Sequence, residues 1–525
     1  IEPNGDKSSI DLLEIVAWFI LIIAWVNFFN LTTISSIKRI KEIGVRKVNG
    51  ALRRHLIWQF LSESALINII AIVFAVILFE LSQPYFANIA GLPSHVNLFV
   101  ETWFLEILIL AFGVGTLSAG IYSVTGIASS TLVNVLKGST IGMIRKSTLK
   151  KGLVTFQFAI AIALIAGTVG VYLQYQFVRN RDLGFNKDEM LVIKAPVVGD
   201  TSLIRKFWVF EQEVKNNTKV SGITFSSIIP GKPNMFNRGG IYRKGDDPNN
   251  SKNYRVTEAD SHYLDVYGLR LLAGTGFTGI PANDKSLIVL NRNAALLMGF
   301  KSENDAVGKE IVMEENTFRI AGVVVDFFQL SPKESIEPQI FRYPRRFQGY
   351  FTINYDGSET TNLLPIVAEN FKTLFPNNPF DYFYLNQFYD KQFQYEKRFG
   401  IVFFLFSLLS LLITVLGLLG LSAYTAEMRQ KEIGIRKVLG ASVQSILRIL
   451  YQEYLLLLVI ASAIALPVVG YFLNKWLTSF ALKMTISVWI FIIPIIIVAL
   501  LSIITIGYQS LKLALRNPVE CLKYE

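Results

Sequence analysis

The sequence is poor in the residue types that build disulfides, metal sites and hydrolytic active sites. Its 525 residues include one cysteine, Cys521, and three histidines, His55, His95 and His262. A single cysteine excludes an intramolecular disulfide, and so few ligands argue against a structural metal site. No Ser/His/Asp set and no pair of catalytic carboxylates can be recognised by spacing. We therefore expect a protein that is not an enzyme and carries no cofactor.

A phosphate-binding loop is also absent from the sequence. Gly231-Lys232-Pro233 and Gly308-Lys309-Glu310 lack the upstream glycine and the hydroxyl residue of the Gly-x-x-x-x-Gly-Lys-[Ser/Thr] motif. The chain should therefore not bind or hydrolyse ATP itself.

Charged residues are scarce, at 17% of the chain against 52% hydrophobic residues, and the mean hydropathy is positive. A soluble protein of this length needs more polar surface, so the composition predicts insertion into a membrane. Seven apolar stretches reach the roughly 20 residues that cross a bilayer. They lie near residues 12–34, 62–82, 102–125, 153–175, 398–423, 453–473 and 487–508.

The net charge of +11 belongs to the membrane part of the chain. Residues 178–396 hold 26 Lys and Arg against 26 Asp and Glu, so this region is neutral. By the positive-inside rule, the basic segments face the cytoplasm and 178–396 lies outside. A nucleic-acid-binding surface would instead form one continuous basic patch, so we expect a lipid bilayer and no nucleic acid. Most of the excess lies in residues 36–55, 126–151, 425–448 and 509–525.

The start of the chain is a polar lead-in from Ile1, without an initiator methionine or a signal peptide. The charge distribution makes the chain begin outside, cross seven times and finish inside. Because that is an odd number of crossings from outside, we expect an upstream part to be missing.

A short basic motif occurs twice. Residues 41–51 are KEIGVRKVNGA and residues 431–441 are KEIGIRKVLGA, identical at 9 of 11 positions. Each copy follows one apolar stretch and precedes two more, and Glu63 and Glu453 occupy equivalent positions beyond them. This pattern predicts a parallel internal repeat of the kind found in duplicated transport proteins.

Helical geometry indicates a docking element in each motif. Glu432 and Arg436 are four residues apart with the acid first, the favourable order for an ion pair, and the first copy repeats this order. Gly440 suits a left-handed helix end. A plain basic anchor in the membrane, the alternative, needs charge but no fixed order of residues. An apolar side is expected from Ile435, Val438 and Leu439.

Four acidic residues lie in or beside the apolar stretches: Glu63, Glu80, Glu106 and Glu453. An ionisable residue in a membrane span suggests a functional role. Glu63 and Glu453 are close to basic segments, however, so pairing with Arg or Lys is the simpler explanation. No line of such residues crosses the bilayer, which argues against an ion pathway.

Residues 178–396 alternate strand and helix patterns and predict a mixed α/β domain. Residues 388–399 contain no Gly or Pro, so we expect a helix that continues into the next span. A flexible tether, richer in Gly, Pro or Ser, is the alternative. Aromatic residues such as 382–384 are expected in the core and not in a ligand-binding cluster. Strands are predicted at 190–194, 286–290 and 318–325, and helices at 202–216, 292–299 and 360–375.

Three regions carry a family resemblance. KEIGIRKVLGAS follows GLLGLSAYTAEMRQ, and the chain closes with NPVECLKYE. The outer region contributes YLDVYGLRLLAGTGF (263–277), IVLNRNAALLMGF (288–300) and AGVVVDFFQLSPKESIEPQIF (321–341). Together they resemble the permeases of the FtsX/MacB superfamily of ABC transporters. The resemblance is to a duplicated form with a MacB-like periplasmic core domain, truncated at its N-terminus.

The resemblance implies that each motif is a coupling helix that meets a separate cytoplasmic ATPase. Two copies would let one chain meet both subunits of an ATPase dimer. Asn49 stands where the second copy has Leu439, so the two docking faces need not be equivalent. The residues that carry over are Lys41, Glu42, Gly44, Arg46, Lys47 and Gly50, and Lys431, Glu432, Gly434, Arg436, Lys437 and Gly440.

The expected fold is an α-helical transmembrane bundle of seven spans with a parallel internal repeat, plus a mixed α/β extracytoplasmic domain. It should lie in the bacterial cytoplasmic (inner) membrane, with residues 178–396 as a MacB-like periplasmic core domain. Residues 1–151 would be a first FtsX-like half of three spans, without its leading span and outer domain. Residues 152–177 would lead the second half, and 397–525 would complete it with three spans.

The function implied by the resemblance is that of a non-catalytic permease subunit. It would couple ATP hydrolysis by its partner to motion of the periplasmic domain, and so export or extrude peptide, lipoprotein or other periplasmic cargo. The alternative is a signalling or regulatory module that controls a cell-wall hydrolase or a sensor kinase. An ion-coupled secondary transporter is a third hypothesis, against which the absence of a polar pathway argues.

Overall fold

The computed structural model describes residues 7–38, 46, 52–90, 100–128, 141–198, 202–217, 219–345, 348–357 and 360–514. The chain divides into two compact units. The membrane unit comprises Ile1–Gln174, Glu396–Trp476 and Thr485–Glu525, and its described elements are helices. The outer unit comprises Tyr175–Tyr395 and Leu477–Met484 and holds every strand that the structure describes.

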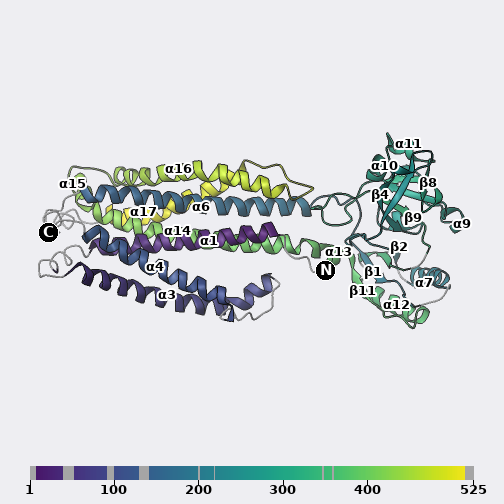
Figure 1. Cartoon of the computed structure of the whole chain (residues 1–525), viewed down its shortest axis with the longest axis horizontal. Coiled ribbons are helices and arrows are strands. Elements are labelled where there is room, and N and C mark those ends of the chain that lie inside the picture. Colours follow the sequence, from purple (N-terminus) through teal and green to yellow (C-terminus); the bar gives the residue numbers. More distant parts are fainter. Residues whose placement is uncertain are drawn as a thin grey trace. The chain divides into compact units, whose positions relative to one another are not determined.

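The membrane unit is built from long apolar helices (Figure 1). In the described part of the chain, six helices are long and apolar enough to cross a membrane, where the sequence predicted seven spans. The difference concerns α4, for which the apolar part identified among the described residues is Thr102–Leu117. The helices are α1 Lys7–Lys38, α3 Arg53–Ala90, α4 Thr102–Ala128, α6 Ile141–Arg179, α14 Gln394–Met428, α15 Gln430–Val438, α16 Val443–Leu477 and α17 Trp489–Ala514.

Helix α6 forms the centre of the second half. Phe158, Ala161 and Ile165 on α6 share one apolar core with Leu418 of α14 and Leu458 of α16, and α17 completes this core. The small side chain of Ala161 is fully buried, which lets neighbouring helices approach closely. The second half is therefore an arrangement of four helices in which α14, α16 and α17 pack against α6.

Helix α1 joins the two halves of the membrane unit. Ile23 of α1 packs in one cluster with Leu164 of α6 and Phe403 of α14. The side-chain amide of Asn27 on α1 also donates a hydrogen bond to the carbonyl of Ile413 on α14, at 3.4 Å. On its other side, α1 contacts α4, which packs on α3.

The outer unit contains two sheets with separate cores. The first sheet is antiparallel, in the order β11-β1-β10-β2. Phe207 and Phe210 of α7 and Phe371 of α12 pack with Phe351 of β10, so the two helices cover one face of the sheet. These elements are β1 Met190–Lys194, β2 Val220–Ser226, β10 Tyr350–Tyr355, β11 Tyr382–Tyr384, α7 Leu203–Asn217 and α12 Thr360–Leu374.

The second sheet closes on itself. Its order is β5-β8-β6-β9-β4-β3-β7, and β7 pairs with β8 as well as with β3. Closure pairs the backbone of six strands around a core that includes Tyr254, Ile288, Ile320 and Ile340. The strands are β3 Asn237–Arg243, β4 Lys252–Glu258, β5 Leu271–Gly274, β6 Leu287–Asn291, β7 Glu310–Met313, β8 Asn316–Val324 and β9 Gln339–Arg342.

The predicted mixed α/β domain is confirmed, and each predicted strand and helix is present within two residues of its expected bounds. The helix that enters the membrane unit begins later than predicted, at Gln394 instead of residue 388. It follows α13 and a 3-10 turn without a gap. Of the aromatic residues 382–384 that were expected in the core, Phe383 and Tyr384 are half-buried and Tyr382 is exposed. The remaining short elements are α8 Tyr263–Val266, α9 Pro281–Asp284, α10 Arg292–Leu297, α11 Glu303–Ala306, α13 Leu385–Asp390 and the 3-10 turns Pro248–Asn250 and Lys391–Phe393.

Asp260 connects the two sheets of the outer unit. It lies just after β4 of the closed sheet and accepts hydrogen bonds from Thr224 and Phe225 of β2, the latter from the backbone N–H at 2.9 Å. The backbone N–H of His262 donates a further bond at 3.1 Å. Burial outweighs these hydrogen bonds and raises the pKa of the Asp260 carboxyl to about 6.

Candidate functional site

The second copy of the repeated motif forms α15, the short helix that the sequence predicts. Its expected ion pair is present, with Glu432 Oε1 and Arg436 Nη2 2.7 Å apart. Gly440 has a φ of +90°, and the backbone N–H of Ala441 donates to the carbonyl of Arg436 at 2.9 Å. These features make the glycine-terminated, left-handed helix end that was predicted.

Packing shows which side of α15 faces the neighbouring helices α14 and α16. Ile433 is buried and packs with Ala426 of α14 and Ile446 of α16. Ile433 lies about 200° around the helix from Ile435, because successive residues are about 100° apart. The predicted apolar side is therefore exposed: Ile435 by 52%, Val438 by 64% and Leu439 by 80%.

An ion-pair cluster holds the start of α15 to two membrane helices. Arg429, which precedes α15, places its Nη2 2.8 Å from one carboxylate oxygen of Glu453 on α16. Lys151 of α6 places its Nζ 2.9 Å from the other oxygen. The prediction that Glu453 pairs with nearby basic residues is confirmed. Lys151 was not singled out from the sequence, because it lies 302 positions before Glu453.

The first copy of the motif is described only at Arg46. Its Nη1 donates to the side-chain oxygen of Gln59 at 2.9 Å, and Gln59 in turn donates to Glu63 at 3.3 Å. Glu63 is thus linked to the motif through Gln59. The other predicted docking residues of this copy lie outside the described residues: Lys41, Glu42, Gly44, Lys47 and Gly50.

The segment between α16 and α17 belongs to the outer unit. The backbone N–H of Ala481 donates to the carbonyl of Lys333 at 2.9 Å, and that of Leu482 donates to the carbonyl of Pro332 at 3.2 Å. The Lys333 ammonium also lies 5.4 Å from the centre of the Phe480 ring, within the range of a cation–π contact. Sequence reasoning missed this attachment, because no local pattern in either segment indicates its partner.

No three His, Cys, Asp or Glu side chains in the described part of the chain come together as they would around a metal ion. The surface around α15 consists of ion pairs and exposed apolar side chains.

Comparison with known proteins identifies a family in both halves of the repeat. Residues 14–132 and 404–518 each match the family described as FtsX-like permease C-terminal. No curated protein of similar sequence was found. The two matched segments lie in the two halves of the repeat, and each contains one copy of the KEIG motif. Both halves of the membrane unit thus match the FtsX-like permeases of ABC transporters, and the described apolar helices fit a multi-pass protein of the inner membrane.

Solved structures resemble part of the chain. The periplasmic region of MacB from Actinobacillus actinomycetemcomitans is 15% identical and covers 40% of this chain and 95% of that chain, with a TM-score of 0.29. The extracellular domain of the noncanonic ABC-type transporter YknZ from Gram-positive bacteria is 12% identical. The match to this YknZ domain covers 37% of the present chain and 97% of the YknZ structure, with a TM-score of 0.27. At these scores, the likeness says nothing about what the outer unit binds.

Proposed function

We propose that α15 and its first-copy counterpart dock a cytoplasmic ABC ATPase, and that the membrane unit passes the motion of that ATPase to the outer unit. An ABC permease implies such an ATPase as its partner. The proposal has three parts: the docking residues, an ATPase dimer that meets both motifs, and a mechanical role of the permease in moving peptide, lipoprotein or other periplasmic cargo.

The surface of α15 carries this proposal. Ile435, Val438 and Leu439 are exposed at the i, i+3 and i+4 positions, the spacing by which a helix inserts an apolar strip into a groove on a partner. The neighbouring Glu432–Arg436 pair adds charges that can fix the orientation of a bound partner. A simple anchor in the membrane surface would have no need for this combination.

The anchoring of α15 supports the transmission of motion. Arg429 ties its start to Glu453 of α16, and Glu453 is also paired with Lys151 of α6. Helix α6 has 39 residues, so it is about 58 Å long at 1.5 Å per residue, against about 30 Å for a hydrocarbon core. A push on α15 is therefore applied to helices that extend well beyond the bilayer.

The outer unit offers a second point at which motion can be received. Its residues 480–482 are hydrogen-bonded and packed to residues 332–333, and the chain runs from them through residues 483–488 into α17 of the membrane unit. Movement of α16 and α17 would therefore act on the outer unit in addition to movement of α6 and α14.

The docking role is tested by reversing the charge of Arg46 and Arg436 together, as Arg46→Glu and Arg436→Glu, and measuring ATPase recovery in a pull-down. We expect recovery to fall at least tenfold while the permease remains inserted. Arg270→Glu with Arg292→Glu, an equal change of charge on the exposed surface of the outer unit, serves as the control. Unchanged recovery with the first pair of substitutions would exclude these helices as the docking site.

A swapped ion pair separates docking from helix stability. In Glu432→Arg with Arg436→Glu, the two side chains can still pair across one turn, although in the less favourable order. If α15 needs only its internal pair, the ATPase should still bind. Our proposal expects binding to be lost, because the two charges now face the partner in exchanged positions.

A further inference from the structure

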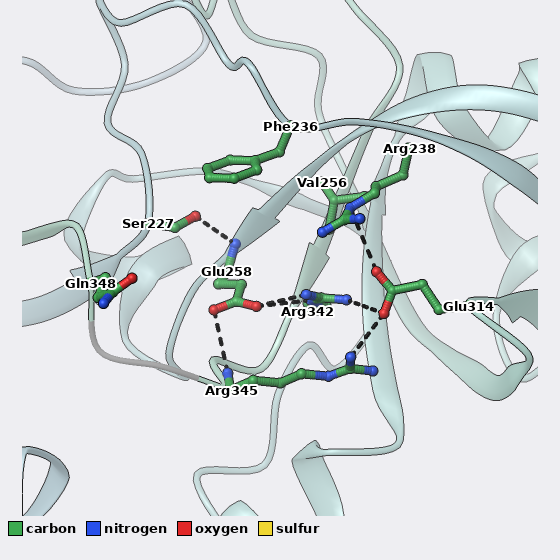
Figure 2. Close-up of a pocket in the computed structure, with 9 residues that line it drawn as sticks. All are labelled: Ser227, Phe236, Arg238, Val256, Glu258, Glu314, Arg342, Arg345 and Gln348. Carbon is green, nitrogen blue, oxygen red and sulfur yellow. Dashed lines mark hydrogen bonds and ion pairs between the residues drawn. The ribbon is translucent and has the colours of Figure 1, made fainter. Parts of the chain in front are cut away.

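A pocket of about 440 Å³ lies against the closed sheet of the outer unit (Figure 2). Its wall contains side chains from β3, β4 and β9 and from the turn between β7 and β8. The volume is within the range of small-molecule sites, roughly 300–1,000 Å³. The pocket belongs entirely to the outer unit and is separate from α15.

Positive charge exceeds negative charge in this pocket. Three arginines, Arg238, Arg342 and Arg345, line it together with two glutamates, Glu258 and Glu314. Arg342 is the buried member, with its side chain 9% exposed, and it lies 2.7 Å from Glu258 and 3.2 Å from Glu314. Both carboxylates are therefore engaged by a fixed guanidinium group, and one net positive charge remains on the pocket wall.

Arg238 and Arg345 reach the same carboxylate from different elements. Their guanidinium groups lie 3.5 Å and 2.8 Å from the two oxygens of Glu314, and Figure 2 shows them converging on it with Arg342. Their side chains are 47% and 49% exposed. A guanidinium group has five N–H donors, so these contacts leave donors available to a molecule in the pocket.

Glu314 lies in a tight turn with an unusual backbone conformation. Glu314 and Glu315 form the turn between β7 and β8 with φ values of +53° and +63°. Such turns favour Asn and Gly, because the left-handed region is costly for other residues. Partial burial opposes ionisation of Glu314, but Arg342, Arg345 and Arg238 outweigh it and lower the pKa of the carboxyl. The arginines are thus arranged around a carboxylate that stays ionised.

An apolar surface lies beside the charged one. Phe236 lines the pocket with 52% of its surface exposed, and Val256 lies on the same wall. Ser227, on the same wall, accepts a hydrogen bond from the backbone N–H of Glu258 at 2.9 Å. A ligand that uses both surfaces has an anionic end and a hydrophobic group next to it.

We propose that the pocket binds an organic carboxylate that carries an apolar group, with the carboxylate on Arg238 and Arg345 and the apolar group on Phe236. Planar guanidinium groups match the two oxygens of a carboxylate. The same chemistry is offered by a free carboxylic acid and by the C-terminus of a peptide. This proposal does not depend on the docking of an ATPase to α15.

The test measures binding to the full chain in detergent by calorimetry. The probes are N-acetylphenylalanine, its amide, a peptide that ends in phenylalanine with a free C-terminus, and the same peptide amidated. We expect each acid to bind at least tenfold more tightly than its amide. Tighter binding of the peptide acid would identify a peptide C-terminus as the ligand, and tighter binding of the acetylated amino acid would identify a small acid.

Variants locate the binding. Arg238→Gln and Arg345→Gln should each weaken the binding of the acids at least fivefold. Phe236→Ala should weaken their binding as well. Arg292→Gln is the matched control, since Arg292 is a similarly exposed arginine paired with Glu303 at 2.7 Å outside the pocket. Equal binding of acids and amides, no binding of any acid, or insensitivity to both arginine substitutions would overturn the proposal. Inorganic phosphate that competes as well as the acids would overturn the role of the apolar group.

Discussion

Asn27 of α1 and Gly417 of α14 lie 390 positions apart, occupy equivalent places in the two halves of the repeat, and touch each other. A Cβ atom built on Gly417 would lie only 2.8 Å from Asn27 Oδ1. The offset of 390 is the same one that relates the two KEIG motifs. In a two-fold arrangement, residues that meet their own equivalents lie at the axis. A pseudo-two-fold relation between the two halves, with its axis between α1 and α14, would produce this contact.

Gly417→Ala should destabilise the contact between the halves. The added methyl group would force the side chain of Asn27 to move, and Gln157 Nε2 of α6, at 3.4 Å, leaves no spare room on the other side. Overpacking of this kind costs about 1–3 kcal/mol. Thermal unfolding in detergent should show a lower midpoint, and adding Asn27→Ala should partly restore it.

Gly113→Ala is the matched control for this substitution, since a Cβ atom at that position in α4 meets nothing within 4 Å. It should leave the midpoint unchanged or raise it slightly, because alanine favours a helix. An equal effect of the two alanine substitutions would show that close packing at Gly417 is not the cause.

Glu453→Gln should loosen α15. The substitution removes the carboxylate shared by Arg429 and Lys151, which are partly exposed, so the cost is about 1 kcal/mol. Hydrogen exchange should become faster across Gln430–Val438, while the spans keep their protection. Glu80→Gln, at an exposed position of α3, is the control. Unchanged exchange in α15 would mean that the contacts of Ile433 alone hold the helix.

The stability of the outer unit should depend on Asp260 between about pH 4 and pH 6. Its pKa is raised to about 6 in the folded state, so the folded protein keeps a proton that the unfolded chain loses above about pH 4. The stability contributed by this group is therefore full below about pH 4 and falls as the pH rises to 6. The pKa difference of about two units corresponds to about 3 kcal/mol.

Urea unfolding of wild type and Asp260→Asn at several pH values tests this dependence. The difference in free energy of unfolding between the two proteins should change across the window, because only the wild type loses the proton. Glu211 and His262, which lie beside Asp260, are present in both proteins and serve as a common background. A difference that stays constant from pH 4 to pH 7 would contradict the assignment.

Most of the membrane helices could be predicted from the sequence, because a span is a local property of about 20 apolar residues. The helix α15 could be predicted equally well, because one short motif contains both its ion pair, Glu432 with Arg436, and the glycine that ends it, Gly440. The structure describes six helices that qualify as spans, against seven predicted, and the difference concerns α4.

Contacts between distant segments could not be predicted. The strand Asn237–Arg243 contains two glycines and shows little alternation of apolar and polar residues, so its place in a closed sheet depends on its neighbours. The same holds for Lys151 with Glu453 and for residues 480–482 on residues 332–333. The charged pocket also arises only when Arg238, Glu314 and Arg345 are brought together by strand pairing.

The contact of Asn27 with Gly417 also bears on the evolution of a fused chain. In a dimer of identical chains, a residue at the symmetry axis faces a copy of itself, so a bulky side chain there must face another bulky one. A single chain that carries both halves is free of this constraint. Here the side-chain amide of Asn27 occupies the space beside Gly417, which has no side chain. Fusion of the halves thus permits two complementary residues at positions where a homodimer must place two identical ones.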